Sequence, residues 1–192
     1  MNVAIIDYGA GNIQSIRFAL ERLGVSATLS SDPETIHSAS HVIFPGVGEA
    51  SSAMAKLKST QLDTLIPELT QPVLGICLGM QLMFNSSEEG NTRGLGIFDS
   101  EVVRFSTTRN VPHMGWNKVK GSGVLFEKIP NDSHFYLVHS YYAIPNLNTV
   151  GYCLYDINFA AAMAKNNFYG TQFHPEKSGA MGAQLLQNFL SL

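Results

Sequence analysis

The chain has 192 residues, of which 45% are hydrophobic and 14% are charged, and its formal net charge is −3. A chain of this length and hydrophobicity can bury a core, so the composition argues against disorder and predicts a single domain over residues 1–192. The small net charge and the absence of a long basic or acidic run argue against nucleic acid or a membrane surface as the main partner.

The first half of the chain alternates short apolar segments with helical patterns. Strands are predicted at residues 2–8, 25–29, 41–44 and 73–76, and helices at 13–23, from Asp32, and at 53–57, 62–69 and 78–84. Several of these strands are continuous apolar runs, which is typical of strands buried on both faces. The pattern predicts an α/β fold with a mostly parallel open sheet flanked by helices.

The second half has a different pattern. It contains β-like segments at residues 94–105, 115–120, 135–144, 150–154, 160–165 and 168–173, with turn residues between them. We interpret these segments as antiparallel strands added to the same sheet. Helical spacing of apolar residues predicts a terminal helix over residues 180–192.

Cys77 and Cys153 are the two cysteines of the chain. Two cysteines do not indicate a disulfide framework, and this favours a reducing, cytoplasmic setting. The apolar residues 1–7 lack a basic leader, so we do not expect a signal peptide, and no apolar run approaches the length of a membrane span.

Cys77 lies in the segment Gly75-Ile76-Cys77-Leu78-Gly79, directly after a predicted strand. This is the thiol form of the G-x-S-x-G nucleophile elbow, in which a strand turns sharply into a helix with the nucleophile at the apex. Glycines fit two residues before and after the nucleophile because larger side chains would collide there. The following helix directs its positive end at the thiol and favours the thiolate. A buried strand cysteine is the alternative interpretation.

A candidate base stands near the other end of the chain, in Gln172-Phe173-His174-Pro175-Glu176. On an extended segment, His174 and Glu176 project to the same side, and Pro175 disfavours a helix there. A carboxylate beside His174 would hold one tautomer and stabilise the imidazolium. A lone H-x-E pattern is weak, but a nucleophilic thiol needs such a base.

Two glycine-rich turns follow other predicted strands. Pro45-Gly46-Val47-Gly48 is suited to exposing backbone, and the Val47 N–H is a candidate oxyanion donor together with the Leu78 N–H. The turn Gly9-Ala10-Gly11-Asn12 lacks the third glycine and the lysine of phosphate-binding loops, so we do not predict nucleotide binding there. Because loops at the carboxyl ends of parallel strands gather at one edge, these turns and the elbow should meet.

Four further clusters carry weaker indications: Gln81 one helical turn after Cys77, Glu88 and Glu89, residues 139–142, and residues 112–117 with the single tryptophan. Each of them taken alone is more simply explained by structure or solvated surface. His113 has no partner that the sequence identifies. The histidines show no metal-ligand spacing, so we expect neither a metal nor a cofactor.

The three motifs around Val47, Cys77 and His174, in this order and at these separations, resemble the class I (triad) glutamine amidotransferases along most of the chain. Residues 7–12 and 112–117 narrow the resemblance to the glutaminase subunits of imidazole glycerol phosphate synthases, of the histidine pathway. The resemblance implies a Cys77–His174–Glu176 triad that hydrolyses glutamine through a glutamyl thioester, with the Val47 and Leu78 amides as oxyanion hole.

By position, the resemblance also implies residues that hold the substrate glutamine, namely Gly48, Gln81, Glu89, Ser140 and Tyr141. Glu89 would face the ammonium group of the substrate. Many family members have Thr where this chain has Ser140, and a hydroxyl is retained.

The resemblance further implies that the chain forms a heterodimer with a (β/α)₈-barrel cyclase, which receives the ammonia through an internal channel. Residues that match partner-facing positions are Asn12, Trp116, Tyr136 and Lys177.

Three alternatives stay open at this point. The first is the glutaminase of another synthase, of pyridoxal phosphate, anthranilate or guanylate type, and residues 112–117 argue against it. The second is a cysteine peptidase of related fold, although Gln81 and the Val47 turn suit an amide side-chain pocket better. The third is a non-catalytic interaction module, which an intact set of Cys77, His174 and Glu176 disfavours.

Overall fold

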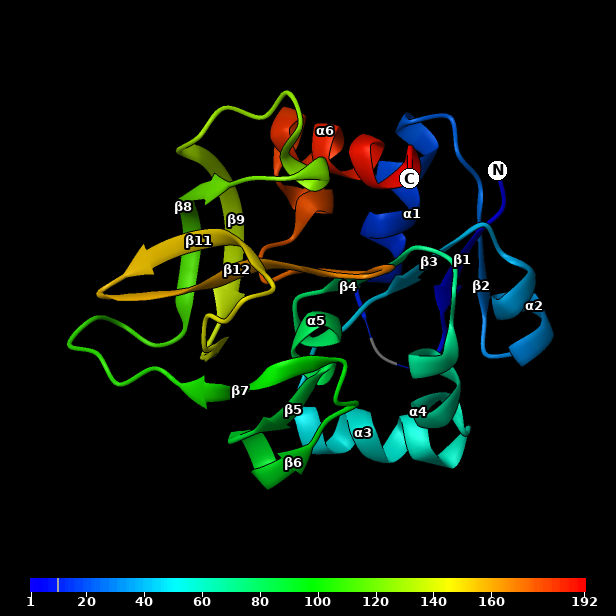
Figure 1. Ribbon diagram of the computed structural model, residues 1–192, viewed down its shortest axis with the longest axis horizontal. Helices are drawn as coiled ribbons and strands as arrows, with labels where there is room; N and C mark the ends of the chain where they lie inside the picture. Colours follow the sequence, from blue (N-terminus) through cyan, green and yellow to red (C-terminus); the bar gives the residue numbers. More distant parts are fainter. Residues whose placement is uncertain (10) are drawn as a thin grey trace.

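The computed structural model describes residues 1–9 and 11–192, and in this part of the chain one mixed sheet of 13 strands runs through the molecule (Figure 1). Its first half is parallel, in the order β2-β1-β3-β4-β13. These strands are β1 (Val3–Ile6), β2 (Ala27–Ser30), β3 (His41–Phe44), β4 (Val73–Ile76) and β13 (Phe168–Thr171). The predicted parallel sheet is therefore confirmed for the first half of the chain.

Helices cover both faces of the parallel half. Figure 1 shows α1 (Ile13–Arg22) and α6 (Gly179–Leu190) on one face, and α3 (Ala50–Ser59), α4 (Leu62–Leu65) and α5 (Leu78–Leu82) on the other. Successive residues of a strand point to opposite faces, so β1 feeds both cores: its residues 3 and 5 pack toward α1 and α6, and its residues 4 and 6 toward α3 to α5. The short helix α2 (Pro33–Ser38) is capped by the Asp32 carboxylate, which accepts from the Thr35 N–H at 2.8 Å.

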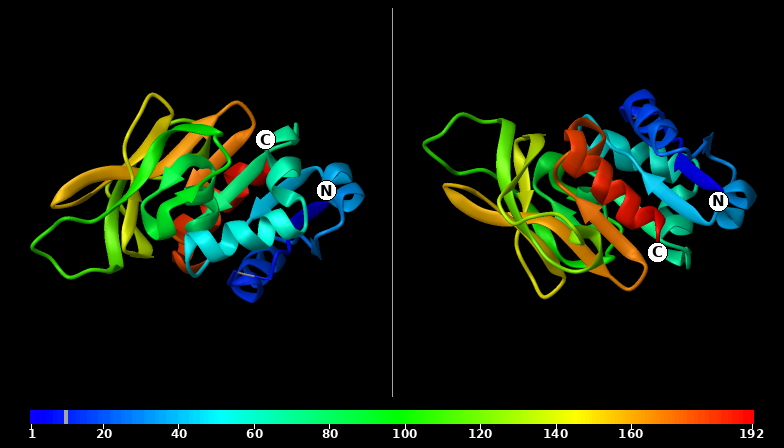
Figure 2. Two further views of the ribbon diagram at one scale, coloured as in Figure 1. Left: turned by 90° about the horizontal axis from the view of Figure 1, so that it is seen from below. Right: turned by 90° about the horizontal axis from the view of Figure 1, so that it is seen from above.

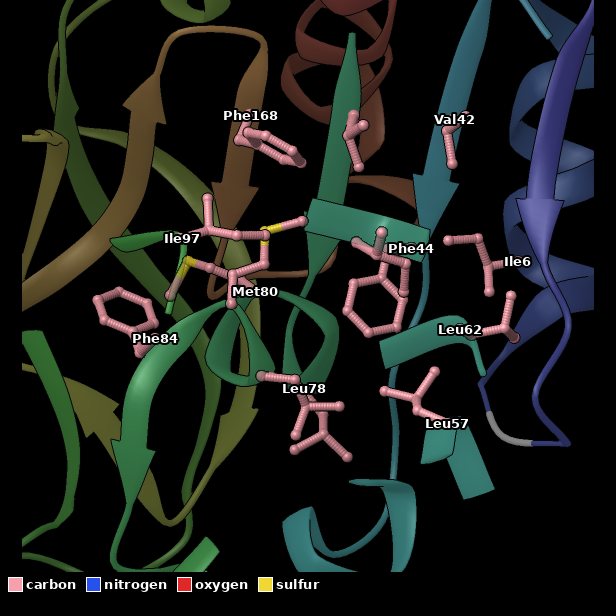
Figure 3. Close-up of a cluster of buried hydrophobic side chains, with 14 of the residues drawn as sticks. Ile6, Val42, Phe44, Leu57, Leu62, Leu78, Met80, Phe84, Ile97 and Phe168 are labelled. Carbon is pink, nitrogen blue, oxygen red and sulfur yellow. The ribbon is translucent and has the colours of Figure 1, made fainter. Parts of the chain in front are cut away.

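The core on the α5 side anchors the helix that follows Cys77. Leu78 and Met80 of α5 are buried, and they belong to one cluster with Phe44 of β3 and Leu57 of α3 (Figure 3). Fully burying an aliphatic or aromatic side chain of this kind contributes about 1.5–3 kcal/mol. The helix is only five residues long, so this packing, rather than helix propensity, holds it in place.

The second half of the sheet is largely antiparallel. From β13 the order continues through β12 (Ile157–Lys165), β10 (Tyr141–Ala143), β7 (Phe98–Arg104), β5 (Phe84–Ser87) and β6 (Thr92–Arg93). A branch from β12 adds β11 (Thr149–Tyr155), β8 (His113–Gly121) and β9 (Ser133–His139). Figure 2 shows this β-rich part at one end of the molecule and the N-terminal βα units at the other. The predicted α/β fold, with antiparallel strands added from the second half, is confirmed.

Two local predictions were wrong. The helix after Cys77 ends at Leu82 rather than reaching Phe84, because residues 84–87 form β5 and pair in parallel with β7. Ser86 and Ser87 are poor interior helix residues, which is consistent with this early end. Residues 168–173 were predicted as an antiparallel addition to the sheet, but β13 is antiparallel only to β12 and pairs in parallel with β4.

Short 3₁₀ turns complete the structure, at Ile66–Glu68, Glu89–Asn91, Val124–Phe126 and Pro175–Lys177. Among the helices of the described residues, none is long and apolar enough to cross a membrane.

Candidate active site

Cys77 stands at the apex of the turn from β4 into α5, with φ of 55° and ψ of −111°. A positive φ at a non-glycine residue is strained and is held here by the surrounding structure. The helix start leaves no room for side chains: a Cβ on Gly79 would collide with the Phe44 carbonyl, and one on Gly75 would lie 2.8 Å from the Met80 nitrogen. The close packing around the strained apex explains both glycines of the predicted elbow.

The turn of residues 45–48 lies directly against the elbow. A Cβ on Gly46 would collide with the backbone nitrogen of Gly79, so the two segments are in backbone contact. Val47, at the tip of this turn, is 41% exposed, and both Val47 and Leu78 border the same cavity as Cys77. Within the described residues, neither the Val47 nor the Leu78 N–H donates to another protein group. The structure thus brings together the two segments that were predicted to supply oxyanion donors.

His174 and Glu176 form a buried pair. The distance between His174 Nδ1 and Glu176 Oε1 is 2.8 Å, and both side chains are almost inaccessible to solvent. His174 is extended, as predicted, but Pro175–Lys177 continue as a 3₁₀ turn rather than an extended segment. Proline suits the first position of such a turn, since its N–H would be unpaired there. Glu176 reaches back to His174 across this turn.

Ser178 and the strand β9 hold the His174 backbone. The Ser178 hydroxyl donates to the His174 carbonyl at 2.6 Å, and His174 N donates to the Tyr136 carbonyl at 2.9 Å. Ser178 Oγ also accepts from Tyr136 N at 3.0 Å. This set of bonds ties His174, the candidate base, to the second half of the sheet, and the sequence did not point to Ser178.

The imidazole of His174 faces the thiol of Cys77. Burial by itself lowers the pKa of His174 through desolvation, but hydrogen bonding and charge from Cys77 and Glu176 outweigh it and raise the pKa well above the ordinary 6.5. His174 Nε2 has no hydrogen-bond partner within the described residues. No protein group therefore has to be displaced from this nitrogen before it gives or takes a proton.

One cavity of about 340 Å³ opens onto Cys77 and His174. Its walls include every residue predicted to hold substrate, namely Gly48, Gln81, Glu89, Ser140 and Tyr141. Its size is at the lower end of the range for small-molecule pockets. The cavity therefore combines the candidate nucleophile, the candidate base and polar side chains at one edge of the sheet.

The scan against family models matches residues 4–192 to glutamine amidotransferase class-I. The chain belongs to this family. It is 52% identical over 196 aligned positions to the imidazole glycerol phosphate synthase subunit HisH of Bacteroides fragilis, with 100% of both chains covered. It is 49% identical to the subunit of the same name from Haemophilus influenzae, covering 99% of this chain and 97% of the relative.

Solved structures show the same fold at low identity. A putative GMP synthase protein from Thermoplasma acidophilum superimposes with a TM-score of 0.77 at 20% identity, covering 100% of this chain and 92% of that one. A structure described as a glutamine amidotransferase gives 0.78 at 18% identity, covering 98% and 97%. The class I amidotransferase fold is thus shared with proteins whose sequences have diverged widely.

Two of the predicted substrate residues of this amidotransferase have partners inside the protein. Glu89 Oε2 accepts from the Ala50 N–H at 2.9 Å, and burial raises the pKa of Glu89 despite this bond. Gln81 is buried, and its Nε2 donates to the Tyr141 carbonyl at 3.0 Å and to Gln172 Oε1 at 2.8 Å. Because both amide protons of Gln81 are used, a substrate could contact only its carbonyl oxygen or backbone.

Three of the four predicted interface residues, namely Trp116, Tyr136 and Lys177, lie next to one another in space. The Trp116 ring packs edge-on against Tyr136 with 6.2 Å between centroids, and Lys177 Nζ lies 5.9 Å from the centre of the Tyr136 ring. Trp116 is 56% exposed although tryptophan is costly to leave in water, so this surface is suited to a protein partner.

Asn12 is the residue before the first turn of α1, and this helix contacts the 3₁₀ turn that carries Lys177. The turn that contains Asn12 was predicted not to bind nucleotide, and Ala10 in that turn lies outside the described residues. Tyr8 precedes this turn, and its Oη donates to the Pro45 carbonyl at 2.8 Å. Gly11 lies within the turn, and a Cβ on it would lie 3.0 Å from Pro45 Cβ. Asn12 thus stands beside the turn that carries Val47.

Sequence reasoning missed two buried polar groups next to the site. Gln172 is fully buried and its Nε2 lies 3.7 Å from Cys77 Sγ. The alternation of an extended segment places Gln172 and His174 on one side, and this signal could have found it. His113, which had no partner in the sequence, is hydrogen-bonded to His139. Within the described residues, no group of three or more His, Cys, Asp and Glu side chains is placed to hold a metal ion.

Proposed function

We propose that this chain is the glutaminase subunit of an imidazole glycerol phosphate synthase and that Cys77, His174 and Glu176 carry out the hydrolysis of glutamine. The observation that carries the proposal is the meeting of the strained Cys77 elbow with the His174–Glu176 pair at one cavity. Identity of about 50% over the full length to subunits of that synthase supports the reaction and the pathway.

The reaction begins at the Cys77 sulfur. The thiolate attacks the side-chain amide carbon of glutamine, and the carbonyl π electrons move to oxygen, which becomes an oxyanion. His174, held as imidazolium by Glu176 and Cys77, gives its proton to the leaving nitrogen, so that ammonia departs and a glutamyl thioester remains. His174 then takes a proton from water, which attacks the thioester and releases glutamate and the Cys77 thiolate.

The oxyanion of each step is stabilised by backbone N–H groups of Val47 and Leu78. The two residues border the cavity beside Cys77 and their amides are not used within the described part of the protein. Removing one such donor typically slows catalysis by about 10²–10³-fold. Glu89, on the wall of the same cavity, offers a carboxylate for the ammonium group of the substrate.

The ammonia is passed to a (β/α)₈-barrel cyclase partner, which uses it to form imidazole glycerol phosphate and AICAR. The exposed Trp116, the adjacent Tyr136 and Lys177, and Asn12 form the proposed contact surface of the heterodimer. Because Lys177 directly follows Glu176, binding of the partner at Lys177 would affect the rate of glutamine hydrolysis at the triad. Both cysteines are free thiols, which suits the reducing cytoplasm.

The proposal is tested by mixing the purified chain with the candidate cyclase, its nucleotide substrate and glutamine. We expect the glutamate formed to equal the nucleotide product formed, and the glutaminase rate to rise when the cyclase is added. Glutamate formation without any nucleotide product would assign the chain to a different synthase. Absence of glutamate with every synthase partner tried would refute the glutaminase activity itself.

A further inference from the structure

The Cys77 sulfur has a buried polar neighbour besides His174. Gln172, on the segment between β13 and His174, is fully buried, and its Nε2 lies 3.7 Å from Cys77 Sγ. The same sulfur lies 3.9 Å from the Val138 carbonyl oxygen, which can accept from a thiol but not from a thiolate. The donor at Gln172 thus favours the ionised sulfur, and the acceptor at Val138 favours the protonated one.

The orientation of the Gln172 amide follows from its neighbours. The Tyr141 carbonyl can only accept, so the Gln81 atom 3.0 Å from it must be the nitrogen. That nitrogen also lies 2.8 Å from the Gln172 side chain, so the Gln172 atom facing it must be the oxygen. The remaining end of Gln172, which faces Cys77, is therefore the NH₂ group. One backbone carbonyl thus determines which end of the amide meets the sulfur.

The pair of amides is enclosed. Gln172 is 0% and Gln81 is 5% exposed, so water does not compete for these bonds. The Gln172 backbone N–H donates to the Ala161 carbonyl at 2.8 Å and fixes the segment to β12. In a buried environment of this kind, a hydrogen bond from an N–H group to a negatively charged acceptor is stronger than one between neutral groups.

We propose that Gln172 is a further catalytic residue, whose side-chain N–H binds and stabilises the Cys77 thiolate, and that Gln81 is the positioning residue that turns this N–H toward the sulfur. The inference rests on the proposed role of Cys77. It also gives Gln81 a second function, because its amide protons bond to the Tyr141 carbonyl and to Gln172 Oε1 and thereby orient the Gln172 N–H toward Cys77.

The test is the pH–rate profile for carboxamidomethylation of Cys77 by iodoacetamide in the full chain, with the labelled peptide identified by mass spectrometry. Burial raises the pKa of Cys153 to about 12, so this thiol reacts little below that pH. The variants are Gln172→Leu, which removes the amide, and Gln172→Glu, which keeps its shape and presents oxygen to the sulfur. The matched control is Gln187→Glu, on the exposed side of α6.

In Gln172→Leu the midpoint of the profile should move to higher pH by about one unit. At a pH below the midpoint, this shift corresponds to a tenfold smaller fraction of thiolate. Gln172→Glu should move it at least as far, and Gln187→Glu should leave it in place. A folded Gln172→Leu protein with an unchanged midpoint would overturn the proposal, while loss of glutaminase activity in Cys77→Ala would still stand.

A measurement on the unmodified sequence makes the test independent of how the variants fold. In protein labelled with ¹⁵N-glutamine, the side-chain amide resonance of Gln172 should titrate with the same midpoint as the alkylation of Cys77, and that of Gln187 should not. A Gln172 resonance that stays fixed while Cys77 ionises would contradict the proposed bond.

Discussion

His113 and His139 are joined by a hydrogen bond of 3.0 Å between His113 Nδ1 and His139 Nε2, and both rings are buried. Asn117 Nδ2 donates to the Leu154 carbonyl at 3.0 Å and lies 3.2 Å from His113 Nε2, so His113 Nε2 accepts and His113 Nδ1 carries the proton. His139 Nε2 then accepts from His113 Nδ1, and His139 Nδ1 donates to the Tyr141 carbonyl at 2.7 Å. The pair is thus neutral, with each tautomer determined by its neighbours.

The neutral pair should make stability depend on pH. Burial, and to a lesser extent Arg109, lowers the pKa of His113 to about 4. Burial lowers the pKa of His139 to about 3, with His113 and His174 adding to the effect and the Tyr141 carbonyl opposing it. An unfolded histidine has a pKa of about 6.5, so below this pH the unfolded chain binds more protons than the folded one. This contribution to stability is therefore present above pH 6.5 and lost as the pH falls toward 4 and then 3.

The measurement is the free energy of unfolding by urea between pH 4.5 and pH 7. His113→Gln removes one of the two titrating groups and should flatten the decline in stability over this range. The exposed His37→Gln variant is the control and should keep the slope of the parent protein. An identical slope in His113→Gln and the parent would show that His113 is not held neutral.

Glu176→Gln keeps the shape of the side chain and removes its charge. The bond of 2.8 Å to His174 Nδ1 would no longer stabilise an imidazolium, and release of glutamate should fall by about 10²–10⁴-fold. Steady-state glutamate release is the measurement, and the exposed Glu68→Gln variant is the control. A loss of less than tenfold in a folded variant would remove Glu176 from the proposed triad.

Gly46→Ala should separate the turn of Val47 from the elbow. Its Cβ would collide with the Gly79 nitrogen, which should cost about 1–3 kcal/mol of stability and displace the Val47 N–H from the oxyanion. Gly24→Ala is a useful comparison: its positive φ of 77° penalises alanine, but its Cβ would meet no atom within 4 Å. We expect both variants to lose stability, as measured by thermal unfolding. Only Gly46→Ala should lose glutaminase activity.

Lys177→Ala and Asn12→Ala should weaken the coupling between the two subunits. Lys177 packs over Tyr136 and follows Glu176 directly, so its loss alters the contact surface next to the proposed base. The measurement is the ratio of nucleotide product to glutamate, which should fall below that of the parent complex. Lys58→Ala, on the exposed side of α3, should leave the ratio unchanged. Unaltered ratios in both interface variants would reject these two residues as part of the interface.

Short-range patterns in the sequence predicted much of the fold. The strands at residues 41–44 and 73–76 were predicted with their observed limits, because continuous apolar runs bounded by turn residues leave little freedom. The position of β13 beside β4 could not be predicted, since strand order depends on pairing between distant segments. For the same reason β5 was missed: its partner β7 stabilises a strand where the local sequence continues a helix.

In the candidate site, too, local patterns were predictable and long-range contacts were not. Cys77 and His174 each belong to a local motif, and because a nucleophilic thiol requires a base, the presence of one motif supported the interpretation of the other. Gln172 contacts Cys77 across 95 positions of sequence, and His113 contacts His139 across 26. The alternation of residues 172–174 places Gln172 on the side of His174, but the contact of either pair depends on segments that are distant in the sequence, which only the folding of the sheet brings together.

The proposed hydrolysis of glutamine depends most directly on Cys77 as the nucleophile. The decisive measurement is glutamate release from glutamine by Cys77→Ala in complex with the cyclase, together with nucleotide product formed from added ammonium. We predict that glutamate release is abolished, because the thioester cannot form, while ammonium still supports the cyclase at the rate of the parent complex. Glutaminase activity that persists in Cys77→Ala would contradict the mechanism at its first step.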